Sequence, residues 1–516
     1  MNLILEQEEE YWRQRSRVSW LKEGDKNTAF FHAQSSYRKK KNFIKGLMRE
    51  DGIWCEDIGE VRKIATNYFK GLFKSQGKVQ STGIIDAVEP QVTIEMNSTL
   101  LAEFKAEEIQ CALNQMHPTK SPGPDGMPAL FFQKYWSAIS QDVISYCLDV
   151  LNNDKTLDEI NQTTIVLIPK IQNPSLITQY RPISLCNVIY KIISKVLANR
   201  LKKILPSCIN MSQSAFVPNR LITDNVIVAY ELLHAFKRRV KGNKSSFALK
   251  LDMSKAYDRV EWHFLSDMMS KLGFGSRWIS LIMKCITSVS YSIAINGCTS
   301  ENFCPGRGLR QGDPLSPYLF LICTEGLSAA LSKLQRNNGM QGAQASRYGP
   351  RVSHLFFADD SLLFAKAERR ESERVKDVLM NYEKCSGQVI NFEKSAILFS
   401  GNTSVGTKTE IQELFGVQET TNLEKYLGLP TMVGRNRKKS FRDIKNRMEA
   451  RLHGWSKRSL SVGGKEMFLK AIIQAIPTYA MSCFLFPKSF CHELNMMISR
   501  FWWKCDKNKK GIHWLS

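Results

Sequence analysis

The sequence is short of acidic residues and of long apolar runs. Its 516 residues include 49 Asp and Glu against 72 Lys and Arg, which leaves a net charge of +23. No run of eighteen apolar residues is present, and Glu6, Glu8, Glu9 and Glu10 stand where a signal peptide would be apolar. These features argue against a membrane or secreted protein and predict an intracellular one, in the nucleus or the cytoplasm.

The cysteines lack any pairing pattern. There are 13 of them, an odd number, without a C-x-x-C pair or a Cys/His cluster. A disulfide framework and a zinc site are therefore disfavoured, and reduced thiols are expected. No repeat of fixed period occurs, which argues against a solenoid.

The composition is that of a folded protein with several cores. Apolar residues make up 43% of the chain and aromatic residues 10%. At about 150 residues per domain, the length predicts three to four structural units.

The positive charge is concentrated in three stretches. Residues 38–45, 435–451 and 500–510 carry net charges of +5, +6 and +4. A single basic run is usually a solvated face. Three runs interleaved with Tyr37, Phe43, Trp502 and Trp503 favour binding of a nucleic-acid backbone with stacking on its bases.

Hydrophobic periodicity predicts a mixed α+β protein that ends in basic helices. The segment 188–205 has the apolar spacing of an amphipathic helix. Short runs rich in β-branched and aromatic residues predict strands at 163–168, 247–251, 291–295, 353–357 and 361–364, the last two as a hairpin. The turn-rich segment 118–128 is predicted to contain neither helix nor strand.

Carboxylates stand at the ends of two of these strands. Asp252 follows the strand 247–251, and Asp359 and Asp360 follow the apolar segment 355–358. The acidic pair on its own is typical of a hairpin turn. Together with Asp252, it offers the hard oxygen donors that Mg²⁺ requires for phosphoryl transfer.

A glycine-rich segment lies between these strands. Residues 306–317 read GRGLRQGDPLSP, in which the glycines allow close approach of the backbone to a ligand and the arginines suit phosphate. Such loops are frequent, so the segment points to a site only in combination with the carboxylates.

The combination resembles a known family. LDMSKAYDRV (251–260), GLRQGDPLSP (308–317) and FADD (357–360), in this order, resemble the palm motifs of reverse transcriptases of non-LTR (LINE-type) retrotransposons. Further similar blocks are SPGPDGMP (121–128), YRPISL (180–185), QSAFVPNR (213–220), SGQVINFEKS (386–395) and KYLGLP (425–430). WLKEGDKNTAFFH (20–32), GWSKRSLSVGGKE (454–466) and ISRFWW (498–503) resemble its plant-type members.

The resemblance implies an α+β right-hand polymerase fold with fingers, a palm with an antiparallel sheet, and a helical thumb. It divides the chain into an N-terminal helical extension (1–95), fingers and palm (96–420), and a basic thumb with a C-terminal connection (421–516). The implied partners are an RNA template, a DNA primer and deoxynucleoside triphosphates.

The resemblance also implies roles for individual residues. Asp252, Asp359 and Asp360 would bind two Mg²⁺ ions, with Asp360 the more dispensable ligand. Tyr257 would lie under the sugar and reject a 2′ hydroxyl, although a tyrosine of the core is an equal alternative. The remaining roles are triphosphate binding by Lys170 and Arg181, contact with the nascent base pair by Gln311 and Gly312, and protonation of the leaving pyrophosphate by the catalytic Lys394. Lys170 and Lys394 are alternatively solvated lysines.

The family usually carries an endonuclease before the polymerase, and the short stretch before Trp20 leads us to expect a polymerase region without it. The main alternative is a catalytically lapsed relic that only binds nucleic acid. An RNA-dependent RNA polymerase and a splicing maturase are further alternatives. The selection of deoxynucleotides by Tyr257 would distinguish a reverse transcriptase from the RNA polymerase.

Overall fold

The computed structural model describes residues 28–78, 82–242, 244–346, 348–420, 425–434, 437–456 and 460–503. Part of the segment 20–32 and most of the basic stretch 500–510 lie outside the described residues. Within the described part of the chain, no helix has both the length and the apolar character needed to cross a bilayer.

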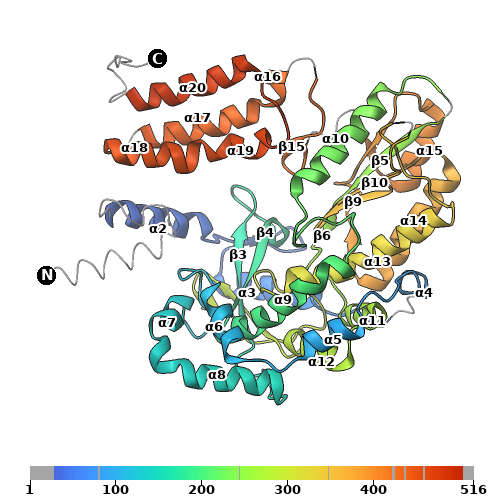
Figure 1. Ribbon diagram of the computed structural model, residues 1–516. Helices are drawn as coiled ribbons and strands as arrows, with labels where there is room; N and C mark the ends of the chain where they lie inside the picture. The colour runs from blue at the N-terminus through green and yellow to red at the C-terminus, as the bar shows by residue number, and fades with distance from the viewer. Residues whose placement is uncertain are drawn as a thin grey trace.

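A five-stranded sheet, which we call the palm sheet, lies towards the right of the view in Figure 1. Its strands, in spatial order, are β13 (Gln418–Glu419), β12 (Ala396–Phe399), β5 (Ser246–Leu251), β10 (Asp360–Lys366) and β9 (His354–Phe357). All neighbours are antiparallel except β12 and β13. The short strands β6 (Met253–Ser254) and β11 (Val389–Ile390) pair beside it. The predicted strand at 247–251 and the predicted hairpin are confirmed.

Both faces of the palm sheet are covered because both sets of alternating side chains are apolar. Phe247, Leu249 and Leu363 belong to the large core that includes several helices, whereas Ala248 and Leu362 pack on the opposite face against α10 (Ile222–Arg238). The helices of the large core include α11 (Trp262–Leu272), α12 (Ser276–Thr287), α13 (Ser316–Arg336), α14 (Arg369–Ser386) and α15 (Val405–Phe415). The sheet is thereby fixed from two sides.

A second sheet, the finger sheet, has the order β4-β3-β7-β8. Its strands are β3 (Gln162–Pro169), β4 (Tyr180–Cys186), β7 (Ser290–Ile295) and β8 (Cys298–Thr299), and a 3₁₀ turn, η1 (Ile177–Gln179), lies between β3 and β4. The predicted strands at 163–168 and 291–295 are confirmed. So is the helix predicted at 188–205, observed as α9 (Val188–Cys208).

The N-terminal helix α3 (Ile58–Leu72) packs on the finger sheet. Val61, Ala65 and Phe69 of α3 share a core with Ile165 of β3 and Ile293 of β7, so this part of the chain packs onto the fingers. The boundary at residue 95 stays a prediction. The other N-terminal elements are α2 (Thr28–Asn42), β1 (Leu47–Met48), β2 (Trp54–Cys55), α4 (Thr82–Ile85), α5 (Ile94–Leu101), α6 (Ala106–Asn114), α7 (Ala129–Lys134) and α8 (Trp136–Asn152). As expected, residues 118–128 contain neither helix nor strand.

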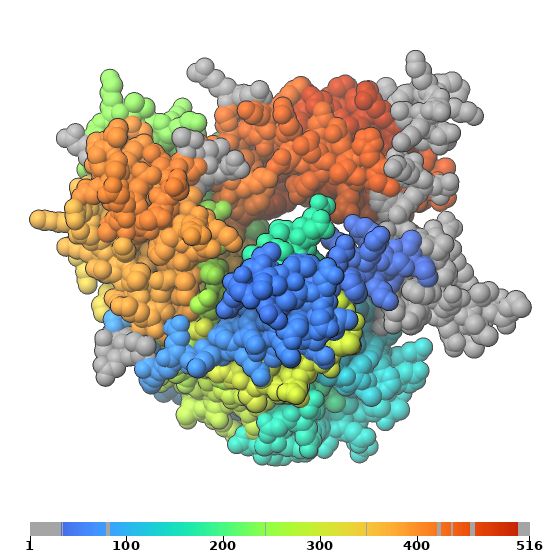
Figure 2. Space-filling view, turned by 180° about the vertical axis from the view of Figure 1, so that it is seen from behind, coloured from blue at the N-terminus to red at the C-terminus, as the bar shows by residue number. Residues whose placement is uncertain are grey.

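The C-terminal helices form a lobe with its own core, which we call the thumb. Figure 2 shows the surface hollowed between this orange-red lobe and the blue N-terminal elements. Val226 of α10 joins the thumb core, and the rings of Tyr230 and Phe484 lie 5.3 Å apart, which connects the lobe to the palm. Its elements are β14 (Lys425–Tyr426), β15 (Leu429–Pro430), α16 (Arg437–Ser440), α17 (Arg442–Ser456), α18 (Val462–Phe468), the π-helix η2 (Leu469–Ile473), α19 (Ala475–Met481) and α20 (Lys488–Trp503).

Candidate functional site

Three carboxylates meet at one end of the palm sheet. Asp252 directly follows β5, Asp359 lies in the β9–β10 turn, and Asp360 begins β10. The pairing of Ser361 with Leu251 places Asp360 and Asp252 at the next position along two adjacent strands. Burial raises the pKa of Asp360, and the negative charges of Asp359 and Asp252 raise it further. The three acids are therefore electrostatic neighbours although they are distant in sequence.

The acids offer the donor chemistry of a divalent-cation site. Asp252 and Asp359 are exposed, and within the described residues none of the three carboxylates takes part in a side-chain hydrogen bond or an ion pair. In the same part of the chain, no three His, Cys, Asp or Glu side chains are gathered closely enough to enclose an ion. Like-charged carboxylates repel one another, which favours such an open arrangement. The hard oxygen donors fit Mg²⁺, and their side chains would have to close around it.

The turn that carries Asp359 is held by a segment far away in sequence. Ala358, just before it, has a left-handed φ of 54°, which costs an alanine about 1 kcal/mol or more. The buried Gln213 supports this turn, because its Oε1 accepts a hydrogen bond of 3.0 Å from the backbone N–H of Ala358. Asn225 donates to the carbonyl of Phe356 at 2.8 Å. Gln213 of the block QSAFVPNR and Asn225 of α10 thus hold the turn that carries Asp359.

The backbone of Asp252 is fixed in a similar way. Its N–H donates to Oγ of Ser395 at 3.2 Å, and its carbonyl accepts from the N–H of Asn391 at 2.8 Å. Both partners belong to the block SGQVINFEKS. Two of the resembling blocks therefore serve to position the acids.

Tyr257 lies beside the acids with its ring held flat. The ring stacks on Phe320 of α13 with centroids 4.5 Å apart and planes 8° from parallel. Burial raises the pKa of the Tyr257 hydroxyl, and the charge of Asp359 raises it further. The half-buried side chain thus combines packing on α13 with proximity to Asp359.

Three positive side chains from the fingers and the palm lie close to one another. Lys170 follows β3, and its Nζ donates to the carbonyl of Thr178 at 3.1 Å. Arg181 lies in the partner strand β4, and Lys394 lies in the turn after β11. Burial lowers the pKa of Lys170, and the positive charges of Lys394 and Arg181 lower it further. The three predicted cations are thus close enough to influence one another.

A fourth cation, Lys255, was not among the site residues predicted from the sequence. Its backbone is left-handed, with a φ of 53°, and its buried Nζ has no hydrogen-bond acceptor among the described residues. Burial lowers the pKa of Lys255 to about 8, and the charge of Lys170 acts in the same direction. The available signal was a lysine inside the palm motif LDMSKAYDRV, three residues after Asp252.

The only carboxylate found to influence both of these lysines, within the described chain, is that of Asp258. It is buried, its Oδ1 accepts from Nε2 of Gln311 at 3.2 Å, and its Oδ2 has no partner among the described residues. Burial raises the pKa of Asp258 to about 6. Around Asp258 the cations therefore outnumber the carboxylate, as a polyanionic ligand requires.

Gln311 and Gly312 join the glycine-rich segment to the fingers. The carbonyl of Gln311 accepts from the N–H of Ser184 in β4 at 3.0 Å. Gly312 has a φ of 115°, and a Cβ there would lie 3.2 Å from the carbonyl oxygen of Ser184. Glycine is thus required at position 312 by both backbone conformation and space.

The two arginines of this segment do not bind phosphate as their type suggested. Arg307 and Arg310 are buried, and their guanidinium groups pair with Glu261 at 3.1 Å and Asp313 at 3.2 Å. Arg310 also lies over the ring of Tyr190 at 4.0 Å. Both arginines fix the loop from inside the protein, because buried charges require partners.

Carboxylates at the end of an antiparallel palm sheet, faced by cations from a finger hairpin and flanked by a separate helical lobe, define a nucleic-acid polymerase of the right-hand type. The family model described as "Reverse transcriptase (RNA-dependent DNA polymerase)" matches residues 168–431. Because this match covers just over half of the 516 residues, the chain belongs to the reverse transcriptase family.

Two of the similar proteins are named as products of mobile elements. Over 97% of its length, the chain is 27% identical to "Transposon TX1 uncharacterized 149 kDa protein" of Xenopus laevis, of which it covers 37%. Over 68% of its length, it is 28% identical to "Retrovirus-related Pol polyprotein from type-2 retrotransposable element R2DM" of Drosophila melanogaster, of which it covers 32%. The chain thus spans about a third of these relatives. The resemblance to non-LTR retrotransposon reverse transcriptases and the right-hand fold are confirmed, while the plant-type assignment stays a prediction.

Proposed function

We propose that this chain copies RNA into DNA by extending the 3′ hydroxyl of a DNA primer with deoxynucleoside triphosphates. The observation that carries the proposal is that Asp252, Asp359 and Asp360 stand at the neighbouring ends of β5 and β10 in the palm sheet. Reverse transcriptases in general use divalent metal ions, and we assign these three residues as ligands of two Mg²⁺ ions. When bound, such ions supply activation of the attacking hydroxyl and neutralisation of the phosphate charge.

The cations facing the acids are proposed to hold the triphosphate. Lys170, Arg181 and Lys255 would neutralise the charge that builds up on the phosphates as the bond to the primer forms. Lys394 would give a proton to the leaving pyrophosphate. This assignment rests on the positive excess around Asp258.

Tyr257, Gln311 and Gly312 are proposed to select and place the incoming nucleotide. The ring of Tyr257, fixed on Phe320, would form a rigid floor that leaves no space for a 2′ hydroxyl. The backbone of Gln311 and Gly312 would lie against the nascent base pair. The hollow below the thumb would hold the template and primer (Figure 2). The division at residues 95 and 420 and action in the nucleus or the cytoplasm remain predictions.

The test is primer extension on an RNA template with Mg²⁺. We expect incorporation of deoxynucleotides by the wild-type chain and at least about a hundredfold loss in Asp359→Ala, because an oxygen donor to the metals is removed. Asp142→Ala, an exposed acid on α8, is the control and should retain full activity. Chelation of the metal should stop the reaction in both active forms.

Other outcomes would reject the proposal. Salt-sensitive binding of primer–template without any incorporation would identify the catalytically lapsed relic. Efficient incorporation of ribonucleotides in place of deoxynucleotides would identify an RNA polymerase and would contradict the role given to Tyr257.

A further inference from the structure

A basic pocket lies on the palm at the end of the sheet opposite to the acids. The loop through Lys244 leads into the first residue of β5, and Lys366 is the last residue of β10, whereas Asp252 and Asp360 stand at the other ends of these two strands. Six to seven residues of strand place the pocket roughly 20 Å from the acids. The pocket is therefore separate from the proposed polymerase site.

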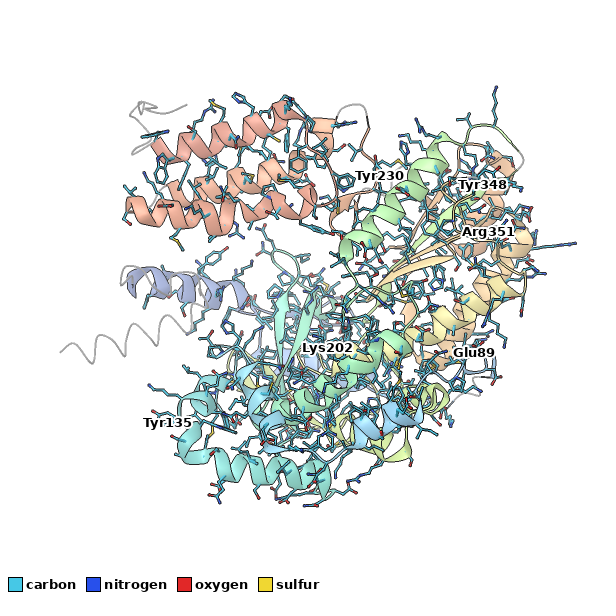
Figure 3. The ribbon with its side chains drawn as sticks, in the orientation of Figure 1. Glu89, Tyr135, Lys202, Tyr230, Tyr348 and Arg351 are labelled. Atoms are coloured by element: carbon cyan, nitrogen blue, oxygen red, sulfur yellow. The ribbon has the colours of Figure 1, made fainter. Side chains whose placement is uncertain are left out.

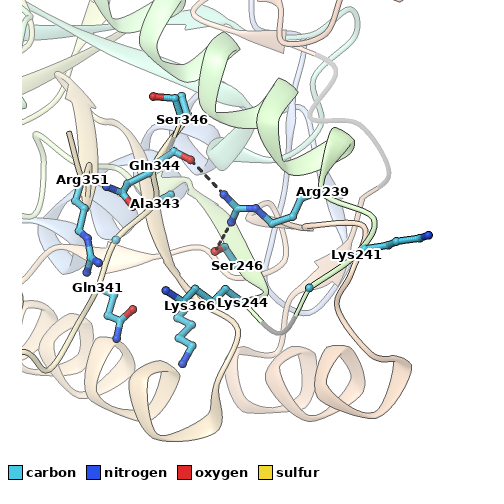
Figure 4. A pocket seen from close by; sticks show the side chains of 13 residues that line it. Arg239, Lys241, Lys244, Ser246, Gln341, Ala343, Gln344, Ser346, Arg351 and Lys366 are labelled. Atoms are coloured by element: carbon cyan, nitrogen blue, oxygen red, sulfur yellow. Dashed lines mark hydrogen bonds between the residues drawn. The ribbon is translucent and has the colours of Figure 1, made fainter. Parts of the chain in front are cut away.

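The described residues that line the pocket include basic side chains but no acidic one. The cavity has a volume of about 540 Å³. Figure 4 shows its cations, which come from the end of α10, from the loop before β5, from the segment 341–351 and from β10: Arg239, Lys241, Lys244, Arg351 and Lys366. Within the described residues, Lys366 pairs with Glu368, and no ion pair involves the other four. This excess of charge attracts a polyanion.

The pocket has a fixed wall as well as charge. The half-buried Arg239 donates to Oγ of Ser246 and to the carbonyl of Gln344, each at 3.4 Å, as the dashed lines in Figure 4 indicate. Nε2 of Gln344 donates to the carbonyl of Gly349 at 2.7 Å, which closes the loop. Ala343 and Val352 form a β-bridge at its base. The loop that carries Arg351 is thus held in place, and Arg239 joins it to the start of β5.

The same loop presents an aromatic side chain to solvent. Tyr348 is 90% exposed and lies near Arg351 at the edge of the palm remote from the thumb (Figure 3). Unpaired bases stack on such rings while lysines and arginines hold the backbone phosphates, which is how proteins grip single strands. A flat anionic membrane would not use a recessed cavity with an ordered polar wall.

We propose that the basic pocket binds the phosphodiester backbone of a single-stranded nucleic-acid segment outside the primer–template cleft. Lys241, Lys244 and Arg351 hold its phosphates, and Tyr348 stacks on a base. The pocket would allow the protein to hold one part of an RNA while it copies another. The assignment does not depend on the three acids of the palm.

The test compares two triple variants with the same change in net charge. The pocket variant is Lys241→Glu, Lys244→Glu and Arg351→Glu, and the control is Lys134→Glu, Lys202→Glu and Lys271→Glu, on α7, α9 and α11. All six side chains are exposed, so both variants are expected to fold, and thermal melts by circular dichroism check this. The probe is a fluorescent single-stranded RNA of about 20 nucleotides, measured by anisotropy over a range of salt concentrations.

We expect the pocket variant to bind the RNA at least about tenfold more weakly than the control at low salt. The slope of log affinity against log salt should fall by about 2, because each phosphate contact to a single strand contributes about 0.7. Tyr348→Ala should weaken binding about fivefold or more without changing this slope. Single-nucleotide extension of a primer–template with a one-nucleotide overhang should stay unchanged in the pocket variant, which separates this proposal from the polymerase function.

Equal weakening of RNA binding in the two triple variants would overturn the proposal. It would show that the pocket residues act only through the net charge of the protein. Loss of co-sedimentation with phosphatidylserine vesicles, with RNA binding equal to that of the control, would also overturn it and identify a membrane contact. If the glutamate variant fails to fold, the corresponding three-glutamine variant gives the same comparison.

Discussion

Lys255 illustrates how one backbone conformation gives a side chain an unusual environment. A left-handed residue directs its side chain differently from a neighbouring strand residue, and here the ammonium group is buried close to Lys170. Both burial and a like charge disfavour the protonated form, and together they bring the pKa down from 10.5 to about 8. The negative charge of a bound triphosphate would offset both effects and favour the protonated form of Lys255.

This environment predicts a pH dependence of nucleotide binding. Above pH 8 Lys255 loses its proton in the free protein, so we expect the KM for deoxynucleotides to rise several-fold between pH 7.5 and 9. Lys255→Arg keeps its charge over this range and should flatten the profile. Steady-state primer extension measures both, with the exposed Lys271→Arg as the control. An arginine variant with the wild-type profile would contradict the role of Lys255.

At the level of secondary-structure elements, the sequence predicted those strands and helices that show a local hydrophobic pattern. Apolar runs at 163–168 and 247–251 became strands β3 and β5, and the helical spacing after Val188 became α9. Strands of two residues, such as β6 and β11, are too short to show alternation. They arise from pairing between segments far apart, which a local pattern does not contain.

The candidate site divides in the same way. The hydrophobic periodicity located the strand ends at which the acids stand. The resemblance to the palm motifs then indicated that these acids belong to one site. The direction of Arg307 and Arg310 could not be predicted, because the partner Glu261 is 46 positions away from Arg307 and only the fold buries both pairs. Lys255 and the basic pocket likewise depend on which segments the fold brings together.

The loop from 306 to 315 is expected to depend on the pair Arg310–Asp313. Asp313 accepts hydrogen bonds from the hydroxyl groups of Tyr190 and Ser194 of α9 and forms an ion pair with Arg310. Asp313→Ala leaves Arg310 buried with its charge uncompensated, so we expect the free energy of unfolding to fall by about 3–5 kcal/mol. Glu89→Ala removes an exposed partner of Arg336 and should cost about 1 kcal/mol or less. Urea denaturation compares the two, and equal losses would refute a structural role for the buried pair.

At the scale of the whole molecule, the net charge of +23 determines how nucleic acid is held. The described part of the basic stretch 435–451 lies on α16 and α17 of the thumb, on one side of the hollow seen in Figure 2. Binding is therefore expected to release many counterions from the nucleic acid. Charge of this kind gives affinity without selecting a sequence.

The consequence is a steep salt dependence of primer–template binding. If about five phosphates are contacted, the affinity should fall by about 10²- to 10³-fold between 50 and 200 mM salt. Asp359→Ala should show the same slope, because the acids take no part in holding the backbone. Anisotropy with a labelled primer–template measures both proteins. A change of less than fivefold over this range would contradict the electrostatic account.

The central position of β5 has a consequence for synthesis on the ribosome. Both neighbours of this strand, β10 and β12, are encoded later, and β12 ends only at Phe399. At a typical 5–20 residues per second, the nascent chain waits roughly 7–30 s between completing β5 and receiving its last partner. During that interval Phe247, Leu249 and Leu251, which form the apolar face of this strand, stay without their sheet and are open to aggregation with other chains.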